Sequence, residues 1–115
     1  MANDASLSLQ QGQLLANTDE PQTIADGART VSLGKKNWEI IQPHISKIIE
    51  VPEWAIRKAM VLLSEVGIRV EPTGAVSVGS LLVDSAFTKQ TIGCILSGGN
   101  VDPDVYDYLI SPENN

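Results

Sequence analysis

Residues 91–100 have the sequence T-I-G-C-I-L-S-G-G-N, and this stretch decides the fold. Residues 91–96 are rich in β-branched and apolar side chains, which predicts a buried strand. The strand is expected to end at residues 97–100, where two glycines can bring the backbone close to a ligand and a hydroxyl and an amide can hydrogen-bond to it. The alternative is a strand-end turn that only requires a positive φ at Gly98 or Gly99.

Two helices are predicted before this strand. The first spans residues 52–66, with Pro52 in its first turn, Gly67 as its stop, and one apolar stripe formed by Ile56, Ala59, Met60, Leu63 and Val66. The second spans residues 73–84, with Thr73 as N-cap. Its many small residues predict very close packing against a neighbour; they are Gly74, Ala75, Ser77, Gly79 and Ser80.

The remaining chain adds shorter elements. We expect strands at residues 45–51 and 68–70, a short helix over residues 37–45 that ends near Pro43, and a terminal helix over residues 102–110 capped by Asp102. Residues 1–22 are polar without a sustained period, which predicts a loop or tail. The alternation predicts an α/β fold, a partial three-layer arrangement with a small, mostly parallel sheet flanked by helices. So small a sheet indicates part of a larger domain.

Composition narrows the function classes. The chain has 115 residues, 43% of them hydrophobic, and a net charge of −6, which fits a soluble globular segment with neither a membrane span nor an export signal. A lone Cys94 and a lone His44 supply neither a disulfide nor a zinc site, so a cytoplasmic location is expected. The acidic balance argues against nucleic acid as a partner.

Two further turns are candidate sites. Residues 71–74, E-P-T-G, join a predicted strand to a helix, and Glu71 could polarise a bound group there. The alternative is that Glu71 interacts only with the N-terminus of that helix. Residues 23–27, T-I-A-D-G, form a third turn, which alone is a weak signal.

Four motifs occur in one order: T-I-A-D-G at 23–27, N-W-E-I-I at 37–41, E-P-T-G-A at 71–75 and L-S-G-G-N-V-D at 96–102. Together they resemble the C-terminal part of the threonine dehydratase and serine racemase family, pyridoxal-phosphate enzymes of the tryptophan-synthase-like fold type II. The resemblance runs from about Ala2 to Ile110. It implies a single segment over residues 1–115, in which residues 23–115 are the C-terminal part of a catalytic domain and residues 1–22 lie at its N-terminal edge.

The resemblance implies a cofactor-binding role for residues 97–100. Ser97 would hydrogen-bond the pyridine nitrogen of pyridoxal phosphate, and Gly98 and Gly99 would let the chain pass close to the ring. Asn100 matches a position at the rim of the site that helps bind a nucleotide effector in the racemases.

Other residues are assigned by the same resemblance. Glu71 matches a glutamate beside the cofactor, and Asp26 with Gly27 matches the turn that closes over the ring. Ala2 and Asp4 match two of the three ligands of a divalent cation such as magnesium, while the first ligand would precede Met1.

The resemblance places the Schiff-base lysine and the glycine-rich phosphate loop in the family's N-terminal portion, so we expect neither in this chain and expect the chain alone to be inactive. The whole enzyme would be an ammonia-lyase (dehydratase) or a racemase, a lyase or an isomerase of amino-acid metabolism. It would act on L-serine or L-threonine, include the missing N-terminal portion as a partner and form a homo-oligomer. The alternatives are a non-enzymatic binding or interaction module and an inert truncated product.

Overall fold

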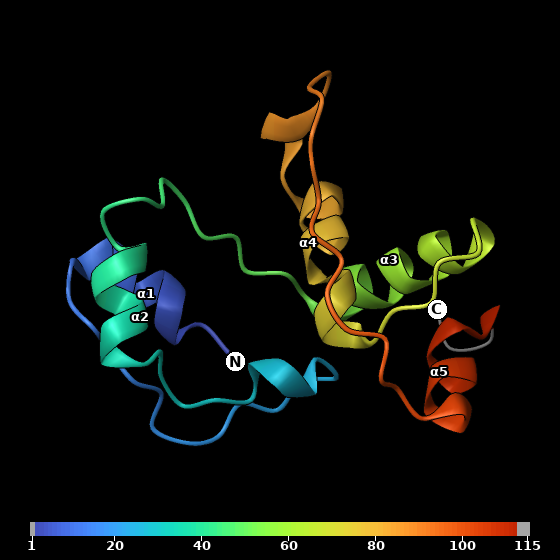
Figure 1. Ribbon diagram of the computed structural model, residues 1–115, viewed down its shortest axis with the longest axis horizontal. Coiled ribbons are helices and arrows are strands. Elements are labelled where there is room, and N and C mark those ends of the chain that lie inside the picture. Colours follow the sequence, from blue (N-terminus) through green and yellow to red (C-terminus); the bar gives the residue numbers. More distant parts are fainter. Residues whose placement is uncertain (1, 113–115) are drawn as a thin grey trace. The chain divides into compact units, whose positions relative to one another are not determined.

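The computed structural model describes residues 2–112, and every regular element in that range is helical (Figure 1). Met1 and residues 113–115, which belong to the predicted tail and the predicted catalytic segment, lie outside the described residues. The chain forms two compact units. The first consists of the residues up to 23 together with 27–50, and the second of residues 24–26 together with the chain from 51 onward.

The first unit begins with helix α1, Asp4–Gln11, so the prediction of a loop or tail over residues 1–22 is wrong in this stretch. Its buried side chains are polar, namely Asp4, Ser6 and Ser8. The fully buried Ser8 hydroxyl donates to the Asp4 carbonyl at 2.6 Å and accepts from the Leu15 N–H at 2.9 Å. These bonds satisfy the buried Ser8 hydroxyl, and because the buried residues are polar the helix leaves no hydrophobic period in the sequence.

Helix α2, Lys35–Ile41, confirms a short helix before Pro43, although it begins two residues earlier than predicted and ends four residues earlier. Trp38 on this helix is buried in the first unit, with 7% of its surface exposed. The exposed His44 follows in a turn.

The second unit is built on helices α3, Glu53–Glu65, and α4, Pro72–Val83, which lie close to the predicted ranges (Figure 1). The core face of α3 consists of Ala55, Ile56, Ala59, Met60 and Leu63. Val66, predicted to continue this stripe, is 69% exposed, because the helix has ended at Glu65. Trp54 in the first turn of α3 is also largely exposed, at 58%.

Helix α4 packs against α3 through Gly79. A Cβ atom at this position would lie 2.9 Å from Cγ1 of Val51 and 3.2 Å from the Ala55 carbonyl oxygen. The predicted close neighbour of the small-residue helix is therefore α3 on this side. The predicted N-cap is wrong: Glu71 occupies the cap position and Pro72 begins the helix, because proline is favoured where the first N–H has no partner.

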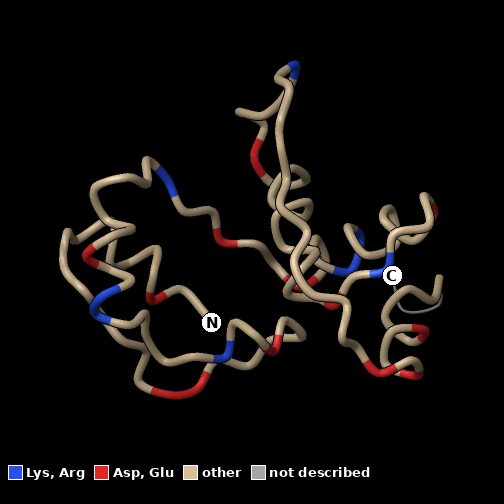
Figure 2. The backbone as a smooth tube through the Cα atoms, viewed as in Figure 1, with Lys and Arg blue, Asp and Glu red and all other residues tan. Residues whose placement is uncertain are grey.

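Helix α5, Pro103–Ile110, completes the second unit. The side chain of Asp102 accepts from the Asp104 N–H at 2.9 Å, which confirms its predicted role as N-cap. Tyr106 and Leu109 are buried. Acidic residues lie along the helix and in the segment just before it (Figure 2).

The predicted strands at residues 45–51, 68–70 and 91–96 are not formed, and no strand is present among residues 2–112. The predicted sheet is therefore not confirmed. A strand requires backbone hydrogen bonds to a neighbouring strand, and residues 91–96 have a helix as their neighbour instead. The Ser77 hydroxyl on α4 donates to the Ile95 carbonyl at 2.8 Å, and the half-buried Cys94 thiol donates weakly to the Ser77 carbonyl.

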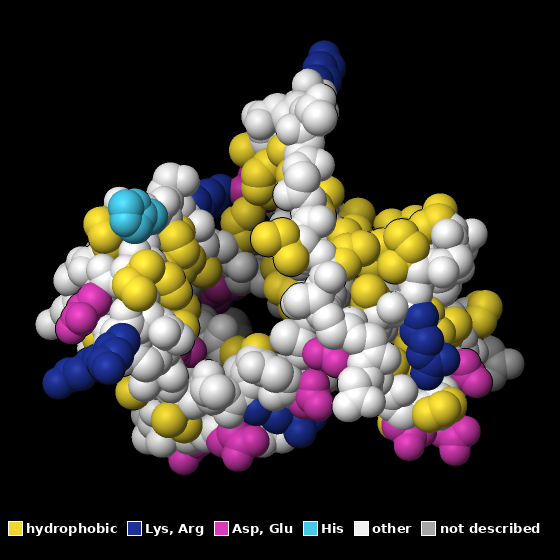
Figure 3. Space-filling view, in the orientation of Figure 1, with side chains coloured by type: hydrophobic (Ala, Val, Ile, Leu, Met, Phe, Trp, Pro, Cys, Tyr) yellow, Lys and Arg dark blue, Asp and Glu magenta, His cyan; other side chains and the backbone are white. Residues whose placement is uncertain are grey.

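Within the described residues, no helix has the length and apolar character needed to cross a membrane. Several large apolar side chains of the second unit remain exposed, and Figure 3 shows hydrophobic side chains gathered over α3 and α4.

Replacing Asp102 by alanine is expected to lower the free energy of unfolding by about 1 kcal/mol, because an orphan N–H at the start of α5 loses its acceptor. Asp102→Asn, which keeps a side-chain oxygen, is expected to retain most of that stability. Denaturant titration of both variants measures the difference. Equal stability of the alanine and asparagine variants would contradict the capping role.

Candidate functional site

The candidate site is centred on residues 97–100, which we call the glycine loop. Gly98 has a φ of 82°, a left-handed conformation that favours glycine. A Cβ atom there would also collide with the carboxylate of Glu71. The predicted need for a positive φ is therefore confirmed at Gly98. The loop also lies so close to Glu71 that residue 98 has no room for a side chain.

Helix α4 supports the glycine loop through its first turn. A Cβ atom at Gly74 would collide with the Ser97 carbonyl oxygen and lie 3.0 Å from the Gly98 carbonyl oxygen. The helix backbone is thus in direct contact with the loop backbone, with no side chain between them. This is the second close neighbour of the small-residue helix.

Glu71 holds the glycine loop through both its backbone and its side chain. Its N–H donates to the Gly98 carbonyl at 3.2 Å, and its Oε2 atom accepts from the Asn100 N–H at 3.2 Å. Although Glu71 occupies the N-cap position of α4, its side chain makes no capping hydrogen bond. The structure therefore favours contact with the loop over the interpretation that Glu71 interacts only with its own helix.

The turn that contains Asp26 is attached to the starts of two helices. The Ile24 N–H donates to Oε2 of Glu53 in α3 at 2.9 Å, and the Thr73 hydroxyl of α4 approaches Oδ1 of Asp26 at 3.4 Å. Between these contacts, Ala25 is buried with 2% exposure. Asp26 is therefore linked through Thr73 to the start of α4, which Glu71 directly precedes.

The Ser97 side chain is exposed, and its hydroxyl makes no hydrogen bond to any residue between 2 and 112. Gly99 and Asn100 are exposed as well. The loop therefore presents a hydroxyl donor beside the backbone that α4 and Glu71 hold. Such an arrangement can bind a hydrogen-bond acceptor on a flat ligand that approaches the glycines.

The predicted site residues are divided between the two units. Ser97, Gly98, Gly99 and Asn100 lie with Glu71 and Asp26 in the second unit, whereas Gly27, Ala2 and Asp4 belong to the first. Ala2 is exposed, and Asp4 is 7% exposed and accepts from the Asn17 amide at 3.1 Å. No cluster of three or more metal-ligating side chains exists within the described part of the chain.

Arg69 also contacts the segment that follows the glycine loop, and sequence reasoning missed it. Its Nη2 atom donates to the Val101 carbonyl at 3.2 Å. Only part of this contact could be predicted from the sequence, where Arg69 and Glu71 flank the apolar Val70. In the structure Val70 is 3% exposed. This alternation is typical of an extended segment with one buried face, but it does not identify the partner.

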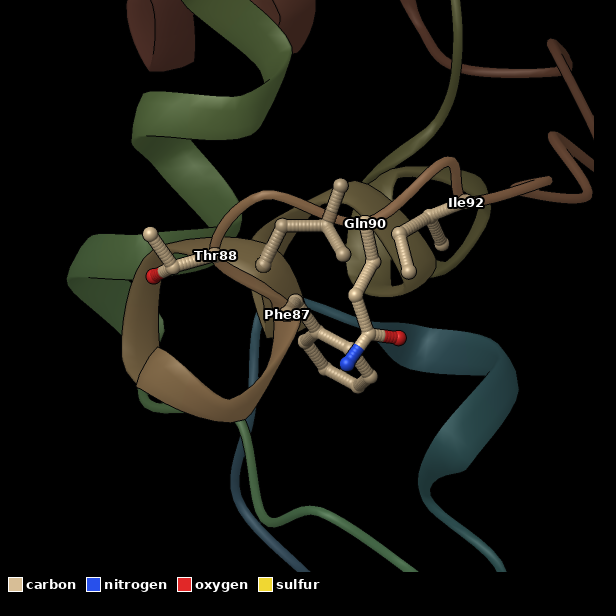
Figure 4. Close-up of a pocket in the computed structure, with 5 residues that line it drawn as sticks. Phe87, Thr88, Gln90 and Ile92 are labelled. Carbon is tan, nitrogen blue, oxygen red and sulfur yellow. The ribbon is translucent and has the colours of Figure 1, made fainter.

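A separate open pocket of about 310 Å³ lies beyond the end of α4. It is lined by Leu81, Phe87, Thr88, Gln90 and Ile92 (Figure 4). None of these is a predicted site residue, and none carries a charge. The pocket therefore adds no acid, base or metal ligand to the site.

Comparison with known protein families assigns the chain to one of them. Residues 2–98 match the family model described as "Pyridoxal-phosphate dependent enzyme". The chain belongs to this family. The resemblance noted from the four motifs is confirmed.

Individual members of the pyridoxal-phosphate-dependent family agree with this assignment. The chain is 38% identical over 111 residues to L-threo-3-hydroxyaspartate ammonia-lyase of Saccharomyces cerevisiae, covering 95% of this chain and 34% of the relative. It is 37% identical over 106 residues to human serine racemase, covering 88% and 31%. The chain thus spans about a third of the length of the curated relatives it matches.

Solved structures of the family give the same result. A threonine deaminase from T.th. superposes with a TM-score of 0.82 at 39% identity, covering 88% of this chain and 37% of that one. Maize serine racemase superposes with a TM-score of 0.80 at 32% identity, covering 90% and 33%. This likeness is consistent with the predicted α/β class, although the predicted sheet is not formed within residues 2–112.

Gly74→Ala is expected to lower the free energy of unfolding by about 1–3 kcal/mol, because the new methyl group displaces the Ser97 carbonyl. This loss should exceed the gain of about 1 kcal/mol in helix propensity. The matched control is Gly93→Ala, where an added Cβ has no atom within 4 Å. Denaturant titration compares the two, and a more stable Gly74 variant would contradict the close contact.

Proposed function

We propose that this chain forms the pyridine-nitrogen side of the cofactor site in a pyridoxal-phosphate-dependent ammonia-lyase or racemase. Its substrate would be a small amino acid with a hydroxyl group on the β-carbon, such as L-serine or L-threonine. The printed names of the relatives fit that class, since they include a hydroxyaspartate ammonia-lyase, a serine racemase and a threonine deaminase. The support from the structure is the glycine loop, with its free hydroxyl held between α4 and Glu71.

Ser97 carries this proposal. Its exposed hydroxyl is free to donate a hydrogen bond to the pyridine nitrogen, and the backbone of Ser97 and Gly98 is held by Gly74 and Glu71. A hydroxyl partner is neutral, so it does not force the ring nitrogen to carry a proton, as a carboxylate would. The backbone that carries the hydroxyl is held before the ligand binds, which lowers the cost of ordering the loop.

When bound, pyridoxal phosphate withdraws electrons from the α-carbon of an amino acid and so makes its proton easier to remove. The residues of this chain would hold and orient the ring for that chemistry. Gly98 and Gly99 present bare backbone, so the ring can approach without meeting a Cβ atom. Asn100 is fixed by its N–H, which leaves its exposed side chain available to a nucleotide effector at the rim of the site.

Glu71 and the turn at Asp26 and Gly27 would define the edge of the same site. Glu71 places a carboxylate directly beside Gly98, so a negative charge lies close to the bound ring. Asp26 is tied to α4 through the Thr73 hydroxyl. We propose that this turn covers the ring on the side where α3 and α4 begin.

A divalent cation such as magnesium is a separate proposal, with Ala2 and Asp4 as two of its ligands. Its support is limited to the backbone carbonyl of an exposed Ala2 and to a carboxylate whose orientation is fixed by Asn17. Two oxygen ligands do not complete a magnesium site. The described residues therefore do not hold the ion by themselves, and no step of the reaction is assigned to it.

The same proposal includes the N-terminal portion of the enzyme and a second copy of the protein as partners. The N-terminal portion would supply the lysine that binds the cofactor covalently and the loop that binds its phosphate. The proposal of an N-terminal portion is supported by the length of the relatives, which is about three times that of the matched region.

The 115-residue chain mixed with pyridoxal phosphate is expected to form no saturable one-to-one complex and to release no ammonia from L-serine. None of its lysines matches the family's lysine position; they are Lys35, Lys36, Lys47, Lys58 and Lys89. Absorbance titration and an ammonia assay measure both quantities. Turnover abolished by substitution of one of these lysines would overturn the proposal.

In the full natural protein that contains this chain, Ser97→Ala is expected to weaken pyridoxal-phosphate binding by about two- to twelvefold. That range corresponds to the roughly 0.5–1.5 kcal/mol of a neutral hydrogen bond. Ser80→Ala is the matched control, since its hydroxyl bonds only to the Ser77 carbonyl of its own helix. Fluorescence titration with the cofactor compares the variants. An unchanged affinity for Ser97→Ala would remove Ser97 from the site.

A further inference from the structure

Arg69 connects the glycine loop to helix α5. Its guanidinium carbon lies 4.4 Å from the centre of the Tyr106 ring, and its Nη2 atom donates to the Val101 carbonyl at 3.2 Å. Its own carbonyl oxygen lies in ordinary van der Waals range, 3.5 Å, of the position that a Cβ atom would take on Gly99. One residue therefore contacts the loop, the segment after it and the helix that follows.

Arg69 and Glu71 act on the same stretch of chain from one extended segment. Val70 between them faces the core with 3% exposure, so its neighbours face away from the core. Glu71 binds Gly98 and Asn100, and Arg69 binds Val101. The two side chains thus bind adjacent residues, Asn100 and Val101, at the C-terminal end of the glycine loop, and the Glu71 N–H binds Gly98 within it.

The glycine loop needs such external support, because glycines lose more conformational freedom on folding than other residues. The loop is exposed throughout and therefore gains little from burial. Tyr106, by contrast, is 6% exposed and firmly placed in α5. Stacking of a guanidinium on an aromatic face is a directional attraction that fixes the plane of the arginine.

Helix α5 offers a second stacking pair that does not involve the loop. The guanidinium carbon of Arg57, from α3, lies 5.8 Å from the centre of the Tyr108 ring. Within residues 2–112, no hydrogen bond joins the Arg57 side chain to residues 97–101. Substitution of Arg57 therefore serves as a matched control, because it disturbs the attachment of α5 without removing a hydrogen bond to residues 97–101.

We propose that Arg69, stacked on Tyr106, is a positioning residue that fixes the glycine loop and thereby the direction of the Ser97 hydroxyl. The role of the loop in cofactor binding rests on the proposed function, whereas the attachment itself does not. Arg69 does not touch the cofactor in this scheme and acts only through residues 98–101.

Backbone amide exchange in the full natural protein, without added cofactor, tests the attachment. The reporter is the Asn100 N–H, which is protected by Glu71. Arg69→Gln and Tyr106→Leu are each expected to accelerate its exchange by roughly tenfold. Tyr106→Phe, which keeps the ring, and Arg57→Gln are expected to leave it near the wild-type rate. Equal acceleration in Arg57→Gln, failure of Tyr106→Phe to preserve protection, or no change in Arg69→Gln would each overturn the proposal.

A cofactor titration then tests the link to Ser97. Arg69→Gln is expected to weaken pyridoxal-phosphate binding several-fold, but to cause no further weakening when Ser97 is already alanine, because it acts through that hydroxyl. Independent, additive losses would overturn this link. Absence of cofactor binding in the wild-type protein would refute the proposed function, whereas the exchange experiment would still decide whether Arg69 fixes the loop.

Discussion

The second unit depends on how closely helix α4 approaches its neighbours. Gly79 brings its backbone against Ala55 of α3, and Gly74 brings it against the carbonyl groups of Ser97 and Gly98. Protein interiors are packed too densely to accept an added methyl group without displacement. The glycine loop therefore lies against a helix backbone that is itself held by α3, and its position is fixed through two successive close contacts.

The functional interpretation follows from the combination of a fixed backbone and a free side chain. Residues 97–100 are exposed, yet they are supported by a helix terminus, by Glu71 and by Arg69. A site that holds a flat ring benefits from this arrangement, because the backbone that carries the donor is already held and less entropy is lost on binding. A side chain at Gly98 or Gly74 would displace the loop even when no ligand is bound.

The sequence contained enough information for the apolar helices and the capped helix. Ile56, Met60 and Leu63 recur at helical spacing, and Asp102 is followed by Pro103, so α3 and α5 could be predicted. Helix α1 could not, because its buried residues Asp4, Ser6 and Ser8 are polar and carry no apolar stripe. Composition indicated an extended segment at residues 91–96 but could not indicate its neighbour, which is α4 instead of a strand.

In the site, too, residues within short contiguous motifs could be predicted, whereas contacts between distant parts of the chain could not. The short motifs predicted Ser97, Glu71 and the glycines as site residues through the family resemblance, because those residues lie in contiguous segments. Arg69 lies 32 residues from Val101, and no local pattern records that bond. Similarly, no local pattern predicted that the chain divides into two units, with Gly27, Ala2 and Asp4 in the first.

The two tryptophans offer a practical consequence of that division. Trp38 is buried in the first unit, whereas Trp54 is largely exposed in the second. A buried indole emits at shorter wavelength than a hydrated one, so each unit carries its own fluorophore with a distinguishable spectrum. Replacing either indole by phenylalanine isolates the other signal. Coincidence or separation of the two melting curves then reveals whether the units unfold as one cooperative body.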